Sequence, residues 1–515
     1  MRLLRFVLVL VGLCVVAIFS LRIAFPLPDR PDVAATRAIP GNAGTTLGAA
    51  VTKRTAAHEE KSGVVSLFDG RDALAARILL ARRAEETIDA QYYIWQTDTT
   101  GWLLLDELRA AAERGVRVRL LLDDNGIPGL DSVLAALNDM ENFEVRIFNP
   151  FTLREPKLVS YLFDFPRLNR RMHNKAMTVD GVAAVIGGRN IGDIYFAFGD
   201  GTAYFDLDAL AIGPVVDDVS SNFDEYWTSE SSYPAETVLP DGTGGLAAME
   251  SATAIARDSV AGSGYLEAVA EAPLVERIVA GEPIFEWTDV TLVSDDPEKG
   301  IGNTDRDVLL MGRITAILEA PTSRVDIVSA YLIPGEAGTR LLTGYAEKGI
   351  ETRVVTNSLE ATDVAPVHSA WVKYRDDLIR SGVDVLELRA SPELEQSSSL
   401  ARLLTGSMSS LHAKTFAIDD ARIFIGSFNF DPRSASLNTE MGFLIESPTM
   451  AQTLSRALDQ RNIFYEVEEG DDGSLRWIED RGSGERVVYD TEPNTSAMQR
   501  MIVRMMGWLP VEWIL

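Results

Sequence analysis

The sequence has little cysteine, little histidine and a shortage of basic residues. Its 515 residues include one cysteine, Cys14, so no disulfide can form within the chain. Lys and Arg number 48 against 76 Asp and Glu, which gives a formal net charge of −28. Such a charge argues against general binding of nucleic acid through its phosphates, although it leaves room for a local basic patch. At this length the chain can form two or more domains with sizeable cores.

Two of the four histidines lie in a short motif that occurs twice. Residues 171–190 and 410–429 each contain a histidine, a lysine two residues later, an aspartate seven residues after the histidine, and an asparagine 17 residues after it. The matched residues are His173 and His412, Lys175 and Lys414, Asp180 and Asp419, Gly188 and Ser427, and Asn190 and Asn429. Because the whole frame repeats, a pair of purely structural histidines is the less favoured interpretation.

Each copy of the motif is predicted to form a β-hairpin. The β-prone stretches 176–179 and 415–418 are each followed by a turn and by a second apolar run, at 182–186 and 422–425. Residues two apart in a strand point to the same face of the sheet. Each histidine should therefore share a face with the lysine that follows it.

Two histidines and two lysines on converging strands suit the transfer of a phosphodiester. One neutral imidazole could attack phosphorus and form a phosphohistidine, while the other protonates the leaving alcohol and then deprotonates the incoming one. Ammonium and amide groups would bind the phosphoryl oxygens as charge develops on them. The phosphate-binding candidates beside the lysines are Asn190, Asn429 and Ser427. This chemistry needs no metal, and we expect no cofactor.

On this motif the sequence is similar to the phospholipase D superfamily over roughly residues 60–515. The stretches 89–95, 167–193, 356–368 and 429–442 resemble, more narrowly, the bacterial cardiolipin synthase C branch. The resemblance implies an α/β fold of two pseudo-symmetric lobes, each a mixed β-sheet flanked by helices, with one shared active site. It also implies phosphatidyl transfer to phosphatidylglycerol to form cardiolipin, with phosphatidylethanolamine as a candidate donor. The implied partners are these phospholipids, a membrane and a candidate auxiliary protein.

The resemblance also implies roles for single residues. The implied catalytic residues are His173, Lys175, Asp180, His412, Lys414 and Asp419. By family analogy His173 is the nucleophile and His412 the acid and base, although the two motifs are too alike for the sequence to establish this order. A carboxylate after each motif should orient an imidazole. In the second half this is Glu440; in the first half Asp206 and Asp208 both fit, and Asp206 is preferred.

Other activities remain open at this point. A phospholipase D that releases phosphatidic acid would differ only in using water as the acceptor. A nuclease of the same superfamily is less favoured because the chain is acidic and carries an apolar leader, and we expect no nucleic-acid partner. A lipid-binding scaffold without catalysis is disfavoured by the two intact motifs.

The leader, residues 1–25, is interpreted as a signal anchor, with a cleaved signal peptide as the alternative. Arg2 and Arg5 precede a charge-free run at 6–21. Basic residues on the N-terminal side predict a cytoplasmic N-terminus, an inner-membrane anchor and a periplasmic body, although Arg22 and Arg30 on the far side weaken that prediction.

The rest of the chain divides into a linker at 26–62, a first lobe at 63–245 and a second lobe at 265–515. The linker prediction rests on Pro, Gly, Ala and Thr without periodicity. Both lobes contain a strand–helix–strand pattern, which favours a duplicated lobe with a parallel or mixed sheet.

Several further residues have two interpretations. The basic aromatic segment 154–175 could admit anionic lipid headgroups or contact a nucleic acid, or its cations could pair with nearby acids. His368 is interpreted as structural rather than catalytic. Tyr92 and Tyr93 could line a lipid cleft or pack in the core. Residues 123–126 could reach the site or cap a turn.

Overall fold

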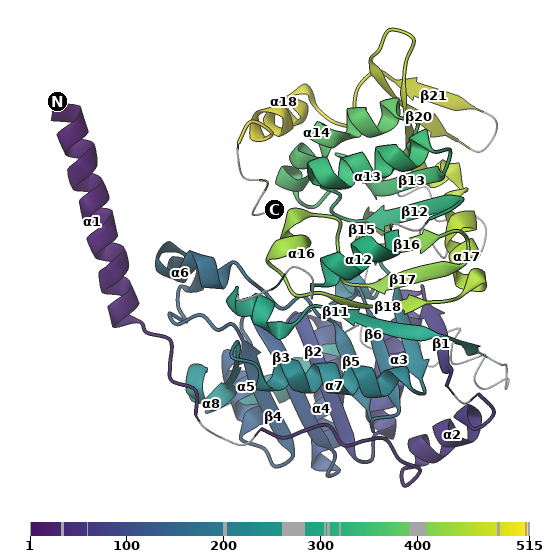
Figure 1. Ribbon diagram of the computed structural model, residues 1–515. Helices are drawn as coiled ribbons and strands as arrows, with labels where there is room; N and C mark the ends of the chain where they lie inside the picture. The colour runs from purple at the N-terminus through teal and green to yellow at the C-terminus, as the bar shows by residue number, and fades with distance from the viewer. Residues whose placement is uncertain are drawn as a thin grey trace.

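The computed structural model describes residues 2–31, 35–58, 60–198, 203–259, 284–302, 305, 309–318, 321–390, 408–481, 485–509 and 512. Within these residues the chain forms two large sheets, one in each half of the sequence, and Figure 1 shows them stacked in one body with helix α1 (Arg2–Ala24) standing apart.

The first sheet has nine strands in the order β10-β1-β8-β6-β5-β2-β3-β4-β9. Its strands are β1 (Ser62–Leu67), β2 (Thr87–Ile94), β3 (Arg117–Gly126), β4 (Phe143–Phe148), β5 (Ala176–Val179), β6 (Ala183–Gly187), β8 (Asp208–Ile212), β9 (Ser232–Pro234) and β10 (Glu286–Thr288). Strands β2, β3 and β4 run parallel, and the other neighbours are antiparallel.

The second sheet has ten strands in the order β11-β18-β17-β16-β12-β13-β14-β19-β20-β21. Its strands are β11 (Val290–Ser294), β12 (Arg324–Ser329), β13 (Glu351–Asn357), β14 (Asp384–Leu388), β16 (Lys414–Ile418), β17 (Arg422–Gly426), β18 (Met441–Ile445), β19 (Phe464–Glu469), β20 (Leu475–Asp480) and β21 (Arg486–Tyr489). The run from β11 to β19 repeats the run from β1 to β9 strand for strand, including the parallel trio β12, β13 and β14. The expected fold of two mixed, pseudo-symmetric α/β lobes is confirmed.

Helices cover both faces of each sheet. The described helices after α1 are α2 (Thr46–Thr55), α3 (Gly70–Arg83), α4 (Thr99–Glu113), α5 (Asp131–Asn138), α6 (Tyr161–Leu168), α7 (Val215–Thr228), α8 (Ala235–Val238), α9 (Gly245–Asp258), α12 (Leu310–Leu318), α13 (Gly335–Glu347), α14 (Ala365–Arg380), α16 (Pro432–Ser436), α17 (Pro448–Leu458) and α18 (Ala497–Met506). Several begin at a capping side chain, such as Asp98 of α4, whose carboxylate accepts a hydrogen bond from the Gly101 amide at 3.0 Å.

The two lobes share one apolar core. Ile186 and Val216 from the first lobe belong to the same buried cluster as Ile423 and Phe443 from the second. Helices α3, α4 and α5 bury the opposite face of the first sheet, and α12, α13 and α14 do the same for the second. Since strands β6, β8, β17 and β18 face one another through this core, the two motif hairpins are held against each other.

The domain boundaries expected from the sequence differ from those of the sheets. Strand β10, beyond residue 265, pairs with β1 and so extends the first sheet. The expected linker contains helix α2, capped by Thr45, and its Thr36 carbonyl accepts a hydrogen bond from buried Arg119 at 2.8 Å. The composition of this segment did not predict its ordered structure, because contacts with the first lobe hold the segment in place and it has no periodic pattern of apolar residues. The region expected between the lobes forms helix α9, and residues 260–283 lie outside the described part.

Candidate active site

Both motifs fold as the expected hairpins, β5–β6 and β16–β17. His173 lies just before β5, and His412 lies just before β16. Each is buried at the junction between the lobes, where a segment of the other lobe pairs with it.

The backbone of each histidine is bonded to the opposite lobe. The His173 amide donates to the carbonyl of Thr439 at 2.9 Å, beside an isolated bridge between Met172 and Thr439. The His412 amide donates to the carbonyl of Phe205 at 2.7 Å, where β7 (Ala203–Phe205) and β15 (Met408–Leu411) form a two-stranded parallel sheet. Neither lobe alone would hold its histidine in place.

The imidazoles are paired with carboxylates in the same crossed way. Nδ1 of His173 lies 2.8 Å from Oε2 of Glu440, which belongs to the second lobe. Nδ1 of His412 lies 2.5 Å from Oδ2 of Asp206, which belongs to the first lobe. When Glu440 is ionised it accepts from Nδ1 of His173, which leaves the Nε2 lone pair of the neutral imidazole for substrate. Nζ of Lys414 also lies 3.0 Å from Nδ1 of His412.

Glu440 is fully buried among hydroxyls. Its carboxylate accepts hydrogen bonds from Oγ of Ser427 at 2.6 Å and Oγ of Ser434 at 2.8 Å. Burial raises the pKa of Glu440 to about 7, although Lys175 and the two serine hydroxyls oppose the rise. The hydroxyl of Ser427 is thus already bonded within the protein, which differs from its expected contact with substrate phosphate.

Asp206 has a different electrostatic setting. Burial alone would raise its pKa, but His412 and Lys414 outweigh burial and hold the pKa of Asp206 below its ordinary value. The alternative carboxylate, Asp208, lies 2.9 Å from the buried guanidinium of Arg77. The structure therefore places Asp206, and not Asp208, against an imidazole, as preferred from the sequence.

Both lysines are buried beside their histidines. Nζ of Lys175 donates to the carbonyl of His173 at 2.6 Å, and Nζ of Lys414 makes the same bond to the carbonyl of His412. Burial lowers the pKa of both ammonium groups. A bound phosphodiester would oppose that effect, since a nearby anion favours the charged form of lysine.

The two imidazoles differ in how far their pKa falls. Burial and the charges of Lys175 and Lys414 hold the pKa of His173 well below its ordinary value. The pKa of His412 is also lowered, by burial and by Lys414, but the carboxylate of Asp206 opposes the fall. Because the charge of Lys414 acts on His173 as well as on His412, the two motifs lie close together in the structure.

Aromatic rings line the imidazoles. The ring of Tyr93 meets His173 edge-on at 5.0 Å between centroids. Tyr204 stacks on His412 at 5.0 Å, and Tyr195 meets His412 edge-on at 5.2 Å. Tyr93 is thus at the site, whereas Tyr92 lies in the core against Arg77. Tyr195 and Tyr204 were missed by sequence reasoning, because no spacing relates them to the motif.

Asp180 and Asp419 do not lie with the imidazoles. Both occupy hairpin turns with positive φ, at 49° and 54°. Asp180 accepts hydrogen bonds from the amides of Glu86 and Thr87, and Asp419 accepts from the amide of Ser323 at 2.7 Å. Each aspartate lies five positions after its lysine, which at about 3.3 Å per residue amounts to about 16 Å along the strand. This position differs from the expected catalytic one; the carboxylates brace the starts of β2 and β12.

The asparagines of the motif lie close to the end of each hairpin. Oδ1 of Asn190 accepts a hydrogen bond from the Ile94 amide at 3.1 Å. Oδ1 of Asn429 is buried and has no hydrogen-bond partner among the described residues. Their binding of phosphate stays a prediction.

The cations of segment 154–175 are largely paired with acids. The pairs include Arg154 with Asp131 at 2.5 Å, Lys157 with Asp124 at 2.9 Å, Arg167 with Asp164 at 2.6 Å and Arg171 with Asp123 at 3.2 Å. The charge-pairing interpretation is thus supported for these four cations. The acids of 123–126 hold this segment beside the site through the Met172 amide, which donates to Asp123 at 2.9 Å.

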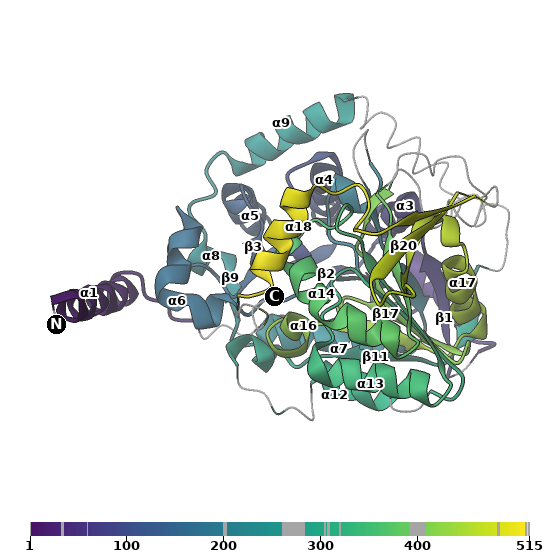
Figure 2. The ribbon, with the colours of Figure 1, turned by 90° about the horizontal axis from the view of Figure 1, so that it is seen from above.

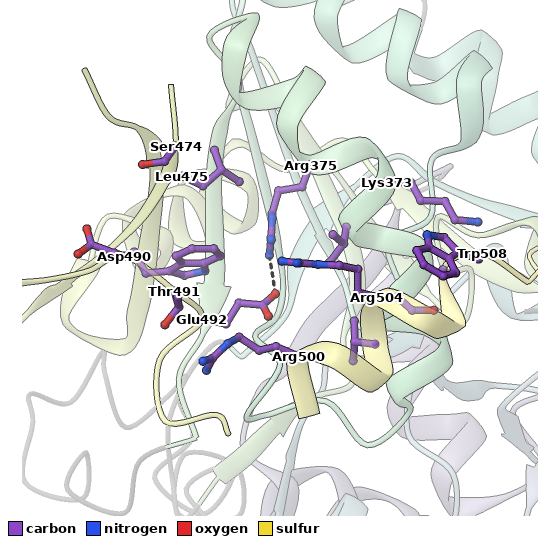
Figure 3. A pocket seen from close by; sticks show the side chains of 15 residues that line it. Lys373, Arg375, Ser474, Leu475, Asp490, Thr491, Glu492, Arg500, Arg504 and Trp508 are labelled. Atoms are coloured by element: carbon purple, nitrogen blue, oxygen red, sulfur yellow. Dashed lines mark hydrogen bonds and ion pairs between the residues drawn. The ribbon is translucent and has the colours of Figure 1, made fainter. Parts of the chain in front are cut away.

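His368 lies elsewhere, as a structural residue. Its Nε2 lies 3.0 Å from Glu492, which also pairs with Arg375 at 3.2 Å. Glu492 and Arg375 line a cavity of about 380 Å³ between α14 and α18, shown in Figure 3. None of the residues that line the cavity belongs to the repeated motif.

Two duplicated lobes that share a pair of histidine–carboxylate couples define the phospholipase D-like class. A family model described as "Cardiolipin synthase, PLD-like domain" matches residues 78–227 and 314–461. The chain belongs to this family.

Individual relatives agree with that assignment. The chain is 45% identical to cardiolipin synthase C of Escherichia coli K12 over 473 residues, which is 91% of this chain and 99% of the relative. It is 35% identical to an uncharacterized protein of Helicobacter pylori J99, over 80% of this chain and 82% of that protein. Among solved structures, phosphatidylserine synthase of Haemophilus influenzae Rd KW20 superposes with a TM-score of 0.55 at 14% identity, covering 90% of this chain and 100% of that one. This last likeness is one of fold.

Proposed function

We propose that the chain is a membrane-anchored phosphatidyltransferase that makes cardiolipin from phosphatidylglycerol. The observation that carries the proposal is the crossed pair of imidazoles at one buried site, His173 with Glu440 and His412 with Asp206. The relative at 45% identity is named cardiolipin synthase C.

His173 is the proposed nucleophile. An attacking imidazole must be neutral, and the pKa of His173 is held well below its ordinary value by burial and two lysines. Nε2 of His173 attacks phosphorus, the bond from phosphorus to the headgroup oxygen breaks, and the leaving oxygen takes a proton from His412. His412 then removes the proton from a hydroxyl of phosphatidylglycerol. That oxygen attacks phosphorus, the P–N bond breaks, and cardiolipin leaves.

The lysines and asparagines serve as the proposed phosphate-binding groups. Lys175 and Lys414 are buried within the same site, where hydrogen bonds and charges act strongly on a developing negative charge. The free Oδ1 of Asn429 supports a contact on that side with a donor, such as the hydroxyl of glycerol.

The proposed donor is phosphatidylethanolamine. Asp363 accepts hydrogen bonds from Tyr204 and Tyr331, both at 3.1 Å, and no cation pairs with it among the described residues. Tyr204 stacks on His412, so this carboxylate lies on the side of the proposed acid, where the headgroup leaves. A carboxylate there attracts the ammonium group of ethanolamine.

The donor proposal has its own test. Asp363→Asn should slow transfer from phosphatidylethanolamine about fivefold, the effect of losing one partly exposed ion pair of about 1 kcal/mol, and spare transfer between two phosphatidylglycerols. Equal slowing with both donors would contradict this role.

The proposed location is the bacterial inner membrane, with the body on the periplasmic side. Residues 4–24 form an exposed helix of 21 residues with a mean hydropathy of 2.7, long and apolar enough to cross a bilayer. Arg2 and Arg5 precede it, which supports a cytoplasmic N-terminus. The experiment below also tests whether a partner protein is needed.

The experiment is to incubate detergent-purified full chain with labelled phosphatidylglycerol, with and without phosphatidylethanolamine, and to resolve the lipid products. Cardiolipin from the wild type but not from His173→Ala or His412→Ala is the expected result. Phosphatidic acid alone would identify a hydrolase instead. DNA cleavage without any lipid product would identify a nuclease. No product from purified protein, but cardiolipin in native membranes, would indicate an auxiliary partner.

A further inference from the structure

A short exposed apolar stripe lies beside the end of the membrane helix. The segment Lys157–Leu168, a 3-10 turn followed by α6, is called the lip below. Leu158 is 75% exposed, Leu162 is 68% exposed and Phe165 is 36% exposed. The three side chains lie within eight residues, and the backbone between Leu162 and Phe165 bends at Asp164, whose φ of −136° and ψ of 29° are not helical. Neighbouring exposed apolar side chains of this kind mark a candidate site for contact with a protein or a membrane.

The lip is joined to helix α1 by two contacts. Arg22 pairs with Asp164 at 3.6 Å, and the ring of Phe25 stacks on Phe163 at 6.2 Å between centroids. Figures 1 and 2 both show α6 next to the C-terminal end of α1. The spanning stretch ends at Ala24, so these contacts fall where the chain leaves the hydrocarbon and enters the headgroup region.

The charges of the lip are neutralised, which lowers the cost of approaching lipid. Lys157 pairs with Asp124 at 2.9 Å, and Arg167 pairs with Asp164 at 2.6 Å. An ion pair is less costly than a single charge in a medium of low dielectric constant.

The lip is also connected to the active site. The Tyr161 hydroxyl donates to Oδ1 of Asn125 at 3.2 Å, and Nδ2 of Asn125 donates to the hydroxyl of Tyr93 at 3.1 Å. The Tyr93 ring contacts His173. Two side chains therefore lie between the exposed segment and the proposed nucleophile.

We propose that the lip inserts Leu158, Leu162 and Phe165 into the leaflet from which the C-terminal end of α1 emerges. A phospholipid then reaches His173 along Tyr161, Asn125 and Tyr93 without its acyl chains passing through water. The occupant of the stripe is the lipid bilayer, and continuity with the anchor is the reason for choosing it over a protein partner. The insertion requires only that α1 lies in a membrane; the route to His173 rests on the proposed function.

The test of insertion uses a spin label on the full chain in nanodiscs of phosphatidylglycerol and phosphatidylethanolamine. Cys14→Ser removes the single native thiol, and Leu162→Cys carries the label. Val488→Cys is the matched control, because Val488 is 52% exposed in β21, on the far side of the body in Figure 1. We expect the Leu162 label to be severalfold more accessible to oxygen than to a water-soluble nickel chelate, and the Val488 label to show the reverse.

Two results would overturn the insertion. One is a Leu162 label as open to the nickel chelate as the Val488 label. The other is protection that occurs only with two protein copies in each disc, which would make a second copy the occupant. Neither readout depends on enzymatic activity, so the insertion can fail while cardiolipin synthesis holds, and the reverse.

The route from bilayer to site has a separate readout. Leu158→Asp with Leu162→Asp should slow turnover of bilayer phospholipid severalfold and leave turnover of monomeric short-chain phospholipid unchanged. Val488→Asp should affect neither. Equal slowing on both substrates would show that the lip acts on the fold of the site and not on lipid access, and would contradict the route.

Discussion

His173 and His412 occupy equivalent positions in the two lobes, yet their carboxylate partners differ. Glu440 shares its charge with two serine hydroxyls, and burial raises its pKa to about 7. Asp206 is bonded to His412 at 2.5 Å and has a pKa below its ordinary value. A carboxylate that stays ionised favours a protonated imidazole, whereas one that is easily neutralised does not.

The difference shows how a duplicated site can perform an asymmetric reaction. One imidazole must be neutral to attack, and the other must be protonated to release the headgroup. Burial and the neighbouring lysines favour the neutral form of His173, and at His412, whose pKa is also lowered, the carboxylate of Asp206 opposes that effect. In the mechanism that we propose, Glu440 and Asp206, each contributed by the opposite lobe, set this division of roles.

The largest effect should come from removing one imidazole at a time. Both His173→Asn and His412→Asn should reduce cardiolipin synthesis by about 10³-fold or more, since each removes a whole catalytic step. Only His412→Asn should still accumulate phosphatidyl-enzyme, slowly, because its nucleophile is intact. Retention of labelled lipid on denatured protein measures this. Accumulation in His173→Asn instead would reverse the assignment.

The next largest effect should distinguish the contributions of Asp206 and Glu440 to kcat. Asp206→Asn should reduce kcat by about 10²-fold, because His412 loses the anion that stabilises its protonated form. Glu440→Gln should reduce kcat by only about tenfold, because near pH 7 its carboxylate is already partly neutral. Steady-state rates on bilayer substrate compare the two variants. Equal losses would mean that the two halves do not differ in the way their charges indicate.

The same comparison has a pH signature in stability. The pKa of Glu440 rises from 4.5 to about 7 on folding, so protonation favours the folded state. The contribution of Glu440 to the free energy of unfolding is fully present below pH 4.5. It is lost as the pH rises through 7, by at most about 3 kcal/mol. Glu440→Gln should therefore lose less Tm than the wild type between pH 5 and pH 8. Parallel Tm curves would contradict this.

A smaller pair of changes exploits the difference between Gly188 and Ser427. A Cβ at Gly188 would overlap Oδ1 of Asp206, so Gly188→Ala should displace that carboxylate from His412 and lower kcat by about tenfold to 10²-fold. Ser427→Ala removes one hydroxyl that Glu440 accepts from, and should cost only about 1 kcal/mol of stability. If the two substitutions lowered kcat equally, the asymmetry would not extend to these positions.

Local spacing was enough to predict the two hairpins and the duplicated sheets. The repeated frame predicted both hairpins, and the repeated strand–helix–strand pattern predicted the duplicated sheets. The crossed pairing could not be read from the sequence, because Glu440 lies 267 residues from His173 and Asp206 lies 206 residues from His412. Only the packed interface brings them together.

For the motif aspartates, the interpretation of the sequence and the position in the structure differ. The family resemblance implied a catalytic part for both, yet the same spacing in the two copies also arises where a strand must end in a tight turn. The strand length, which separates Asp180 from Lys175, was visible in the sequence and would have indicated the far end of the hairpin.

The smallest effect on catalysis should come from these aspartates. Asp419→Ala removes an acceptor for the amides of Thr322, Ser323 and Arg324, and should cost about 2–4 kcal/mol of folding free energy. Asp180→Ala should cost a similar amount, since it accepts from equivalent amides at the start of β2. Below its Tm, each variant should keep kcat within about threefold of the wild type, because the carboxylates lie about 16 Å along a strand from the reacting groups. Rates normalised to the folded fraction, measured alongside thermal unfolding, test this. If Asp419→Ala folded but lost most of its kcat, this aspartate would have a catalytic role after all. The motif would then be functional along its whole length, up to the hairpin turn.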